Sequence, residues 1–307
     1  MTERPFRFGL QLPATDLNGA VATAVRAEAA GFDVVHTCDH LGDSILPPLT
    51  PLAAIAVATE RVRLCPLVVN ADFHHPLGLA RDAVAIDHLS GGRMELGLGA
   101  GHSEPEYRAA GIRFDPPAVR KARLAESVEV LRRLLSGETV DHLGEHVTLR
   151  GATVGRSRQD RLPILVGVNG PRALAHAARH ADTIGLTMLG RTLPDGQRHE
   201  TRWEADRLDA TVAFVRREAA LAGTDPELHA LVQAVVVTHD RAAVATEFVA
   251  QGYAPTEADV LATPFLAIGT PDEIVAHLHE CRARWGISYF SVRDLDAFAP
   301  VVALTRR

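Results

Sequence analysis

The sequence predicts an α/β fold, a (β/α)₈ TIM barrel that forms one domain over residues 1–307. Short apolar segments alternate with longer amphipathic segments along the whole chain, and parallel neighbouring strands need such crossovers. Eight segments have the length of strands, and eight strand–helix units close into a barrel. No linker or break in composition marks a second domain. An open doubly wound sheet is the alternative architecture.

The predicted strands are short runs rich in valine, leucine and isoleucine, as expected of strands buried on both faces. In chain order they comprise residues 6–12, 33–37, 61–69, 94–98, 162–166, 183–186, 229–237 and 287–292. Helices are predicted between them, where apolar residues recur at helical spacing. These helices comprise residues 18–30, 50–59, 76–89, 117–135, 172–180, 203–222, 271–285 and 296–305.

The barrel pattern is interrupted after strands four and seven. A small hairpin is predicted at residues 142–149, and two extra helices are predicted at residues 241–251 and 257–262. Residues 188–201 are polar and contain proline and glycine, so they are predicted to form a loop.

Composition and charge exclude several classes of protein. A net charge of −6 gives no reason to expect a nucleic-acid partner. No segment approaches the roughly 20 apolar residues of a membrane span. Three scattered cysteines and the lack of an export signal favour the cytoplasm.

Two glycine-rich turns follow neighbouring predicted strands. Gly99, Ala100 and Gly101 come after strand four, and the turn from Gly167 to Gly170 comes after strand five. Active sites of such barrels form from the loops after the strands. The second turn leads into a helix, whose N-terminus suits a phosphate. Either turn alone would be interpreted as a tight connection, but the two together favour a cofactor phosphate site.

Neither glycine turn fits the dinucleotide-binding pattern GxGxxG. The third glycine of that pattern would fall on His102 or on Glu104. A P-loop is also absent from the sequence. The phosphate site is therefore not predicted to be a Rossmann or P-loop site.

Titratable residues follow the same strand ends. Asp39 and His40 come directly after strand two, and such a pair suits proton transfer or a hydrogen bond to a cofactor ring. A capping aspartate beside a packed histidine explains the pair equally well. His102 lies just beyond the first glycine turn, whereas Glu104 could equally cap the helix that follows.

The motifs together resemble the luciferase-like monooxygenase superfamily, and within it the oxidoreductases that use the deazaflavin coenzyme F420. They are DHL at 39–41, NADFHHP at 70–76, LSGGRMELGLGAG at 89–101, PILVG at 163–167 and IGTPDE at 268–273. The resemblance implies a luciferase-like TIM barrel, often a homodimer, with a flavin or deazaflavin ring in its mouth. It implies hydride transfer between F420 and a small organic substrate.

The resemblance also implies which residues form the site. His40 or His102 would handle the proton, with Asp39 as the orienting group. A non-proline cis peptide is expected within residues 68–70. The residues expected to bind the cofactor are Asp39, Val68, Val69, Asn70, Gly99, Ala100, Gly101, His102, Gly167, Val168, Asn169, Gly170 and Arg172.

Two residues depart from the pattern of the family's sugar-phosphate dehydrogenases. His102 stands where those enzymes have a glutamate, which argues against their substrate and leaves His102 as a possible acid. Asn169 replaces a glycine, and asparagine tolerates a left-handed backbone better than most residues. The substrate pocket is expected from residues 44–48, 188–201 and 253–262, which carry no substrate signature.

Three other functions remain open at this stage. An FMN-dependent monooxygenase that uses reduced flavin and oxygen would have the same barrel mouth. A metal-dependent hydrolase could use Asp39, His74, His75 and His102 as ligands, but no HxH pair follows strand one and no HExxH motif occurs, so no metal is expected. A protein that only stores a flavin is the third, because a fold does not determine a function.

Overall fold

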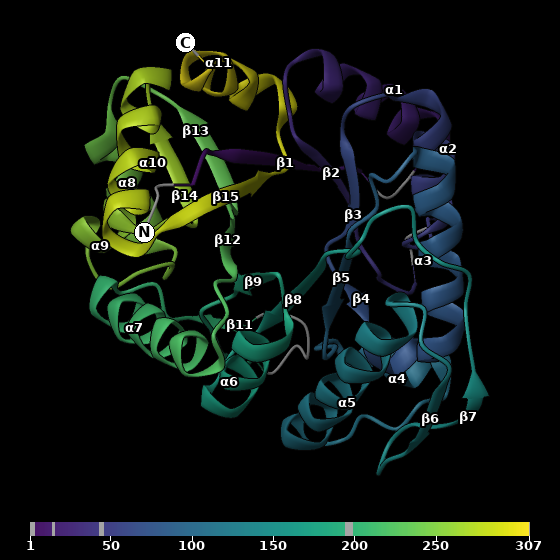
Figure 1. Ribbon diagram of the computed structural model, residues 1–307. Helices are drawn as coiled ribbons and strands as arrows, with labels where there is room; N and C mark the ends of the chain where they lie inside the picture. Colours follow the sequence, from purple (N-terminus) through teal and green to yellow (C-terminus); the bar gives the residue numbers. More distant parts are fainter. Residues whose placement is uncertain (1–3, 14–15, 43–45, 194–198, 307) are drawn as a thin grey trace.

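The computed structural model describes residues 4–13, 16–42, 46–193 and 199–306. Within these ranges a parallel sheet curls around the centre of the molecule, and helices cover its outer side (Figure 1). The order of its nine strands is β3-β2-β1-β15-β12-β9-β8-β5-β4. A bridge between Leu64 and Met94 links the two ends of this order. The predicted barrel is confirmed.

The predicted third strand is divided into β3 (Arg63–Pro66) and β4 (Val69–Asn70), so the nine strands amount to eight barrel positions. The division coincides with a non-proline cis peptide between Leu67 and Val68. This bond lies one residue before the segment in which it was expected. Val69 and Asn70 keep regular parallel pairing with the fourth strand, so the irregular peptide precedes them.

The other barrel strands and the helices outside them lie close to the predicted ranges. The strands are β1 (Arg7–Gln11), β2 (Val34–Thr37), β5 (Leu96–Gly99), β8 (Ile164–Val168), β9 (Thr183–Leu186), β12 (Glu227–Leu231) and β15 (Ile287–Val292). The helices are α1 (Leu17–Ala29), α2 (Thr50–Ala58), α3 (Pro76–Ser90), α5 (Pro117–Leu135), α6 (Pro171–His180), α7 (Ala205–Ala222), α10 (Pro271–Trp285) and α11 (Leu295–Thr305). None of these described helices could cross a membrane.

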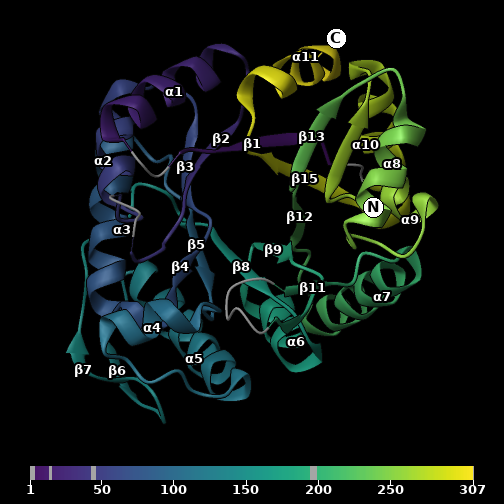
Figure 2. The same ribbon diagram turned by 180° about the vertical axis from the view of Figure 1, so that it is seen from behind.

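The insertion after strand four has two parts. The chain first forms the short helix α4 (Glu104–Ala110), whereas the short helix η1 (Ala71–Phe73) follows strand three and precedes α3. The predicted hairpin is confirmed as β6 (Val140–Leu143) and β7 (Thr148–Ala152). It lies beyond α5, away from the barrel centre, in both views (Figures 1 and 2).

The seventh strand differs from its prediction. Only β12 belongs to the barrel, and the second half of the predicted strand forms β13 (Ala234–Val237). This strand pairs in parallel with β14 (Leu266–Gly269), which was not predicted. The inserted helices α8 (Arg241–Ala250) and α9 (Glu257–Ala262) lie between them in the chain, as predicted. The predicted loop at 188–201 instead contains a hairpin, β10 (Leu189–Thr192) and β11 (His199–Thr201).

Buried ion pairs hold the strand starts together, at the end of the barrel opposite the strand ends. The Arg7 guanidinium contacts Glu95 and Glu227, each at 2.6 Å, and Arg63 also pairs with Glu95. Burial alone would raise the pKa of Glu95, but Arg7 and Arg63 hold that pKa below its ordinary value. A buried charge needs such partners, so this end of the barrel is built for stability.

Candidate active site

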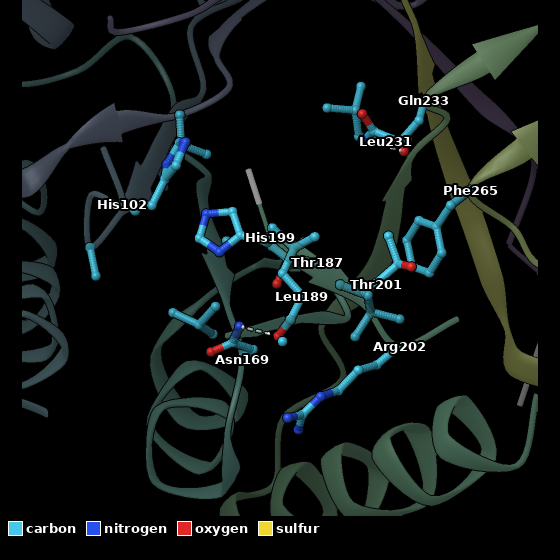
Figure 3. A pocket seen from close by; sticks show the side chains of 18 of the residues that line it. His102, Asn169, Thr187, Leu189, His199, Thr201, Arg202, Leu231, Gln233 and Phe265 are labelled. Atoms are coloured by element: carbon cyan, nitrogen blue, oxygen red, sulfur yellow. Dashed lines mark hydrogen bonds between the residues drawn. The ribbon is translucent and has the colours of Figure 1, made fainter. Parts of the chain in front are cut away.

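A cavity of about 1300 Å³ opens at the C-terminal ends of the barrel strands. Its walls come from the loops after the strands and from the hairpin β10–β11 (Figure 3). The predicted site residues that line it are Asp39, His40, Val68, Asn70, Gly99, Ala100, Gly101, His102, Gly167, Val168 and Asn169. Segments far apart in the sequence therefore meet at one site.

Three predicted residues lie elsewhere. Gly170 lines a neighbouring cavity of about 640 Å³ between α6 and α7. Val69 is fully buried in the core. Arg172 is exposed and lines neither of these cavities. Direct contact of Val69 and Arg172 with a cofactor therefore stays a prediction without geometric support.

Asp39 fixes the backbone at the end of strand three. Its Oδ2 accepts hydrogen bonds from the Asn70 backbone N–H at 2.9 Å and from Nε2 of His74 at 2.8 Å. The side chain is buried beneath the cavity edge. Asp39 was expected to orient His40, but the structure pairs it with His74 instead.

His40 is oriented by Glu106, which lies on α4. The His40 Nδ1–H donates to Oε1 of this carboxylate at 2.9 Å, and the Leu41 backbone N–H donates to its other oxygen at 3.2 Å. A carboxylate only accepts, so the proton of a neutral His40 sits on Nδ1 and Nε2 is left as a base. Glu106 was not among the predicted site residues, because its contact with His40 joins residues 66 positions apart in the sequence.

Three histidines gather at one wall of the cavity. The ring centroid of His102 lies 5.6 Å from that of His40 and 5.1 Å from that of His199. Figure 3 shows His102 and His199 side by side. The His102 side chain is exposed at the cavity wall, and the protein groups packed around its ring partly desolvate the charged form. This desolvation, followed by the neighbouring imidazoles of His199 and His40, lowers the pKa of His102 to about 4. His102 is therefore neutral at pH 7.

The floor of the cavity is a buried hydrogen-bonded chain. His36 Nδ1 donates to the Cys65 carbonyl at 2.9 Å, so its Nε2 accepts from Tyr289 and Ser291. The Ser291 hydroxyl then accepts from His229 Nε2, at 2.9 Å. This order leaves His229 Nδ1 unprotonated, on a residue that lines the cavity. This network of hydrogen bonds was not predicted, because its members lie within apolar strands.

The glycine turns make room for Val68. A Cβ at Gly99 would lie 2.5 Å from Val68 Cγ2, and a Cβ at Gly167 would lie 3.6 Å from Val68 Cγ1. Gly101 has a φ of +69°, and a Cβ there would lie 2.1 Å from the Tyr107 hydroxyl. Glycine is therefore required at positions 99 and 101 for close packing, apart from any ligand.

Polar donors converge between the two glycine turns. Ser103 is buried, and its Oγ has no hydrogen-bond partner among the described residues. Lys121 Nζ contacts Oδ1 of Asn169 at 2.6 Å, and Arg120 donates to the Ala100 carbonyl at 3.3 Å. Burial, followed by the charge of Arg120, lowers the pKa of Lys121. Helix α6 starts beside them without a side-chain cap.

The remaining wall is formed by the predicted substrate loops. Leu189, His199 and Thr201 of the hairpin line the cavity together with Tyr253 and Phe265, and the Thr201 hydroxyl donates to the Tyr253 carbonyl at 2.7 Å. Asn169 Nδ2 donates to the Leu189 carbonyl at 3.0 Å, which ties this hairpin to the second glycine turn (Figure 3). Residues 44–45 and 194–198 of the predicted substrate loops lie outside the described residues.

Comparison with known proteins assigns this barrel to a protein family. Residues 4–289 match the family model of the luciferase-like monooxygenases. The chain belongs to this family. An F420-dependent glucose-6-phosphate dehydrogenase of Nakamurella multipartita is 34% identical to this luciferase-like protein over 191 residues, which are 59% of the chain and 56% of that enzyme. The chain thus spans about half the length of this curated relative.

Solved structures agree with the luciferase-like barrel. A coenzyme F420-dependent tetrahydromethanopterin reductase from Methanopyrus kandleri has a TM-score of 0.75 and 19% identity, covering 98% of this chain and 97% of that chain. A monooxygenase from Streptomyces bottropensis has a TM-score of 0.73 and 25% identity, covering 97% of each chain. The first likeness shows the fold alone.

The cavity of this luciferase-like chain can be tested against a flavin-type cofactor, which combines a planar ring with a phosphate. A cavity of about 1300 Å³ exceeds the size usual for drug-sized ligands. The unpartnered Ser103 hydroxyl is a buried donor without an acceptor, and Lys121 supplies a positive charge to the wall of the same cavity. Buried polar groups are normally paired, so this donor set fits an anionic group.

Proposed function

We propose that this protein is an oxidoreductase that transfers a hydride between coenzyme F420 and a small organic substrate. One observation carries the proposal: a single strand-end cavity joins His40, which Glu106 orients, to a set of donors that fits an anionic group. The F420-dependent relative from Nakamurella multipartita supports the choice of cofactor. When bound, the deazaflavin would supply the two-electron chemistry.

The phosphate end of the cofactor is proposed to bind between the two glycine turns. Ser103 Oγ and Lys121 Nζ would donate to the phosphate oxygens, and Arg120 would add positive charge behind them. The free N–H groups at the start of α6 face the neighbouring cavity at Gly170. A helix N-terminus adds a favourable field for an anion.

His40 is the residue that we propose for proton transfer. Its Nε2 is the free base, and the Glu106 carboxylate stabilises the positive charge that the ring gains on taking a proton. His102 stays neutral because of its lowered pKa, which suits a hydrogen bond to an uncharged substrate oxygen. Asp39 acts indirectly by holding the Asn70 backbone in place.

The second candidate function is an FMN-dependent monooxygenase. The likeness to the Streptomyces bottropensis enzyme favours it, because that protein is a monooxygenase of similar size. The same donors would bind the phosphate of FMN, so the residues of the cavity wall do not distinguish FMN from F420. The homodimer and the cytoplasmic location expected from the sequence stay predictions.

A turnover assay separates the two functions. Oxidised F420 is supplied with small alcohols, and reduced F420 or reduced FMN is supplied with ketones and enones. Each mixture is run anaerobically and in air while cofactor absorbance and oxygen are recorded. The proposal predicts F420 turnover without oxygen uptake. Product formation that requires FMN and consumes oxygen would support the monooxygenase instead.

A further inference from the structure

Two histidines and a glutamate meet on the outer wall of the barrel, on helices α5 and α6. His176 and His180 lie one turn apart on α6, and Glu129 lies on the neighbouring α5. One ligand atom from each of the three side chains lies within 4.8 Å of the others. None of the three lines the cavity described above.

The three side chains are already arranged for convergence. His176 Nε2 lies 2.9 Å from Glu129 Oε1. The rings of His176 and His180 are stacked, with their centroids 4.4 Å apart and an angle of 27° between their planes. Residues four apart on a helix present their side chains on one face, so the spacing in the sequence creates the histidine pair.

From this geometry we infer that Glu129, His176 and His180 form a binding site for a divalent transition-metal ion of the zinc type. Two imidazole nitrogens and one carboxylate oxygen are ligands that Zn²⁺ prefers, whereas Ca²⁺ and Mg²⁺ prefer sites made of oxygen alone. Three protein ligands leave room for a water molecule in the fourth position of a tetrahedron.

The charges around the site are balanced enough to admit a cation. Two nearby arginines would oppose it, but Arg132 pairs with Asp182 and Arg179 pairs with Glu218. Only Glu129 is exposed, so the ion would enter from solvent on its side.

A bound ion would join α5 to α6. Lys121 lies near the start of α5 and Gly170 directly precedes α6, and both residues line the neighbouring cavity beside the proposed phosphate site. A cross-link between the two helices therefore stabilises the folded chain by mass action and fixes the relative position of the two helix starts. Because the site lies outside the cavity, its occupancy is independent of the proposed hydride transfer.

The experiment uses the full chain without a polyhistidine tag. Metal-free protein is titrated with Co²⁺, and the d–d absorption of a tetrahedral nitrogen–oxygen site is recorded. Zn²⁺ binding is then measured by calorimetry, and the midpoint of thermal unfolding is measured with and without Zn²⁺. We expect one ion per chain, a tetrahedral Co²⁺ spectrum and a higher unfolding midpoint with metal.

Two variants and one matched control decide the location. Glu129→Gln changes an exposed side chain, and His180→Ala removes a second ligand; each should weaken Zn²⁺ binding at least about tenfold. His142→Ala is the control, because His142 also bonds to a glutamate of α5, Glu126, at 2.9 Å. It should leave binding unchanged. Absence of saturable binding in the unmodified chain, or binding that persists in both variants, would overturn the inference.

Discussion

His40 and Glu106 form a hydrogen bond of 2.9 Å that joins the loop after β2 to helix α4 of the insertion after β5. The same carboxylate also accepts from the Leu41 backbone. The side chain that moves a proton in the proposed reaction is therefore positioned by a segment that the barrel itself does not need. Helix α4 thus gives the insertion after β5 a role in the proposed proton transfer.

Replacing Glu106 by glutamine should lower kcat by about ten- to a hundredfold, because the neutral amide no longer stabilises a charged His40 ring. Cofactor affinity should change little, since Glu106 is not among the proposed phosphate donors. Steady-state kinetics and a cofactor titration measure the two effects. Glu104→Gln is the matched control on the same helix, where Glu104 makes only an exposed ion pair with Arg108. Equal losses in both variants would contradict the role of Glu106.

Gly99→Ala should destabilise the protein by about 1–3 kcal/mol, which is typical of overpacking. The new Cβ would lie 2.5 Å from a methyl group of Val68, whose branched side chain cannot rotate freely. Gly167→Ala meets the same valine at 3.6 Å and should be nearly neutral for stability. Urea unfolding compares them. If Val68→Ala failed to restore the stability of Gly99→Ala, the clash would not be the cause.

Lys121→Met should weaken cofactor binding at least about tenfold, because a charge-assisted hydrogen bond to phosphate is lost. Lys121 is the only lysine of the chain, so no other lysine side chain can replace its ammonium group at the phosphate. Fluorescence titration with F420 measures the affinity. Lys121→Arg keeps the charge and should retain more of the affinity than the methionine variant. Unaltered binding in Lys121→Met would move the phosphate site elsewhere.

Acid should destabilise the protein through His36. Burial, as the largest cause, lowers the pKa of this histidine from 6.5 to about 4. The unfolded chain then binds a proton more readily than the folded chain, so stability is lost as the pH falls from about 6.5 to about 4, by about 3 kcal/mol in total. The pKa of Glu95 is lowered from 4.5, so protonation of Glu95 reduces the free energy of unfolding only at lower pH.

The measurement is urea unfolding at several pH values between 4 and 8. His36→Gln, which cannot take up a proton, should show a flatter profile over the upper part of that range. His75→Gln, which changes a loop histidine outside the floor of the cavity, should keep the profile of the unmodified chain. An identical slope in all three proteins would exclude His36 as the cause.

Patterns local in sequence predicted most of the barrel. Apolar runs and helix boundaries placed the strands and helices because each is decided by neighbouring residues. The seventh strand was predicted to continue too far, because the apolar run extends through residue 237 although the backbone leaves the barrel after β12. That departure is decided by distant pairing: the Gln233 N–H donates to the Phe265 carbonyl at 2.7 Å.

The candidate site was predicted in part. The glycine turns and His40 stood out because unusual residues at strand ends are visible in a sequence. Lys121 and Arg120 did not, because they occupy ordinary positions of an amphipathic helix. The prediction that Asp39 orients His40 was wrong. Asp39 is adjacent to His40 in sequence, whereas Glu106 comes close to it only in the folded chain.

The central claim is that the strand-end cavity binds F420 through the donors between the glycine turns. Its most direct measurement is a fluorescence titration of the full chain with F420 at low and at high salt, with the Lys121→Met variant beside it. The account predicts saturable binding of one cofactor per chain that weakens with salt and in the variant. Absence of saturable binding, or binding that depends on neither salt nor Lys121, would contradict it.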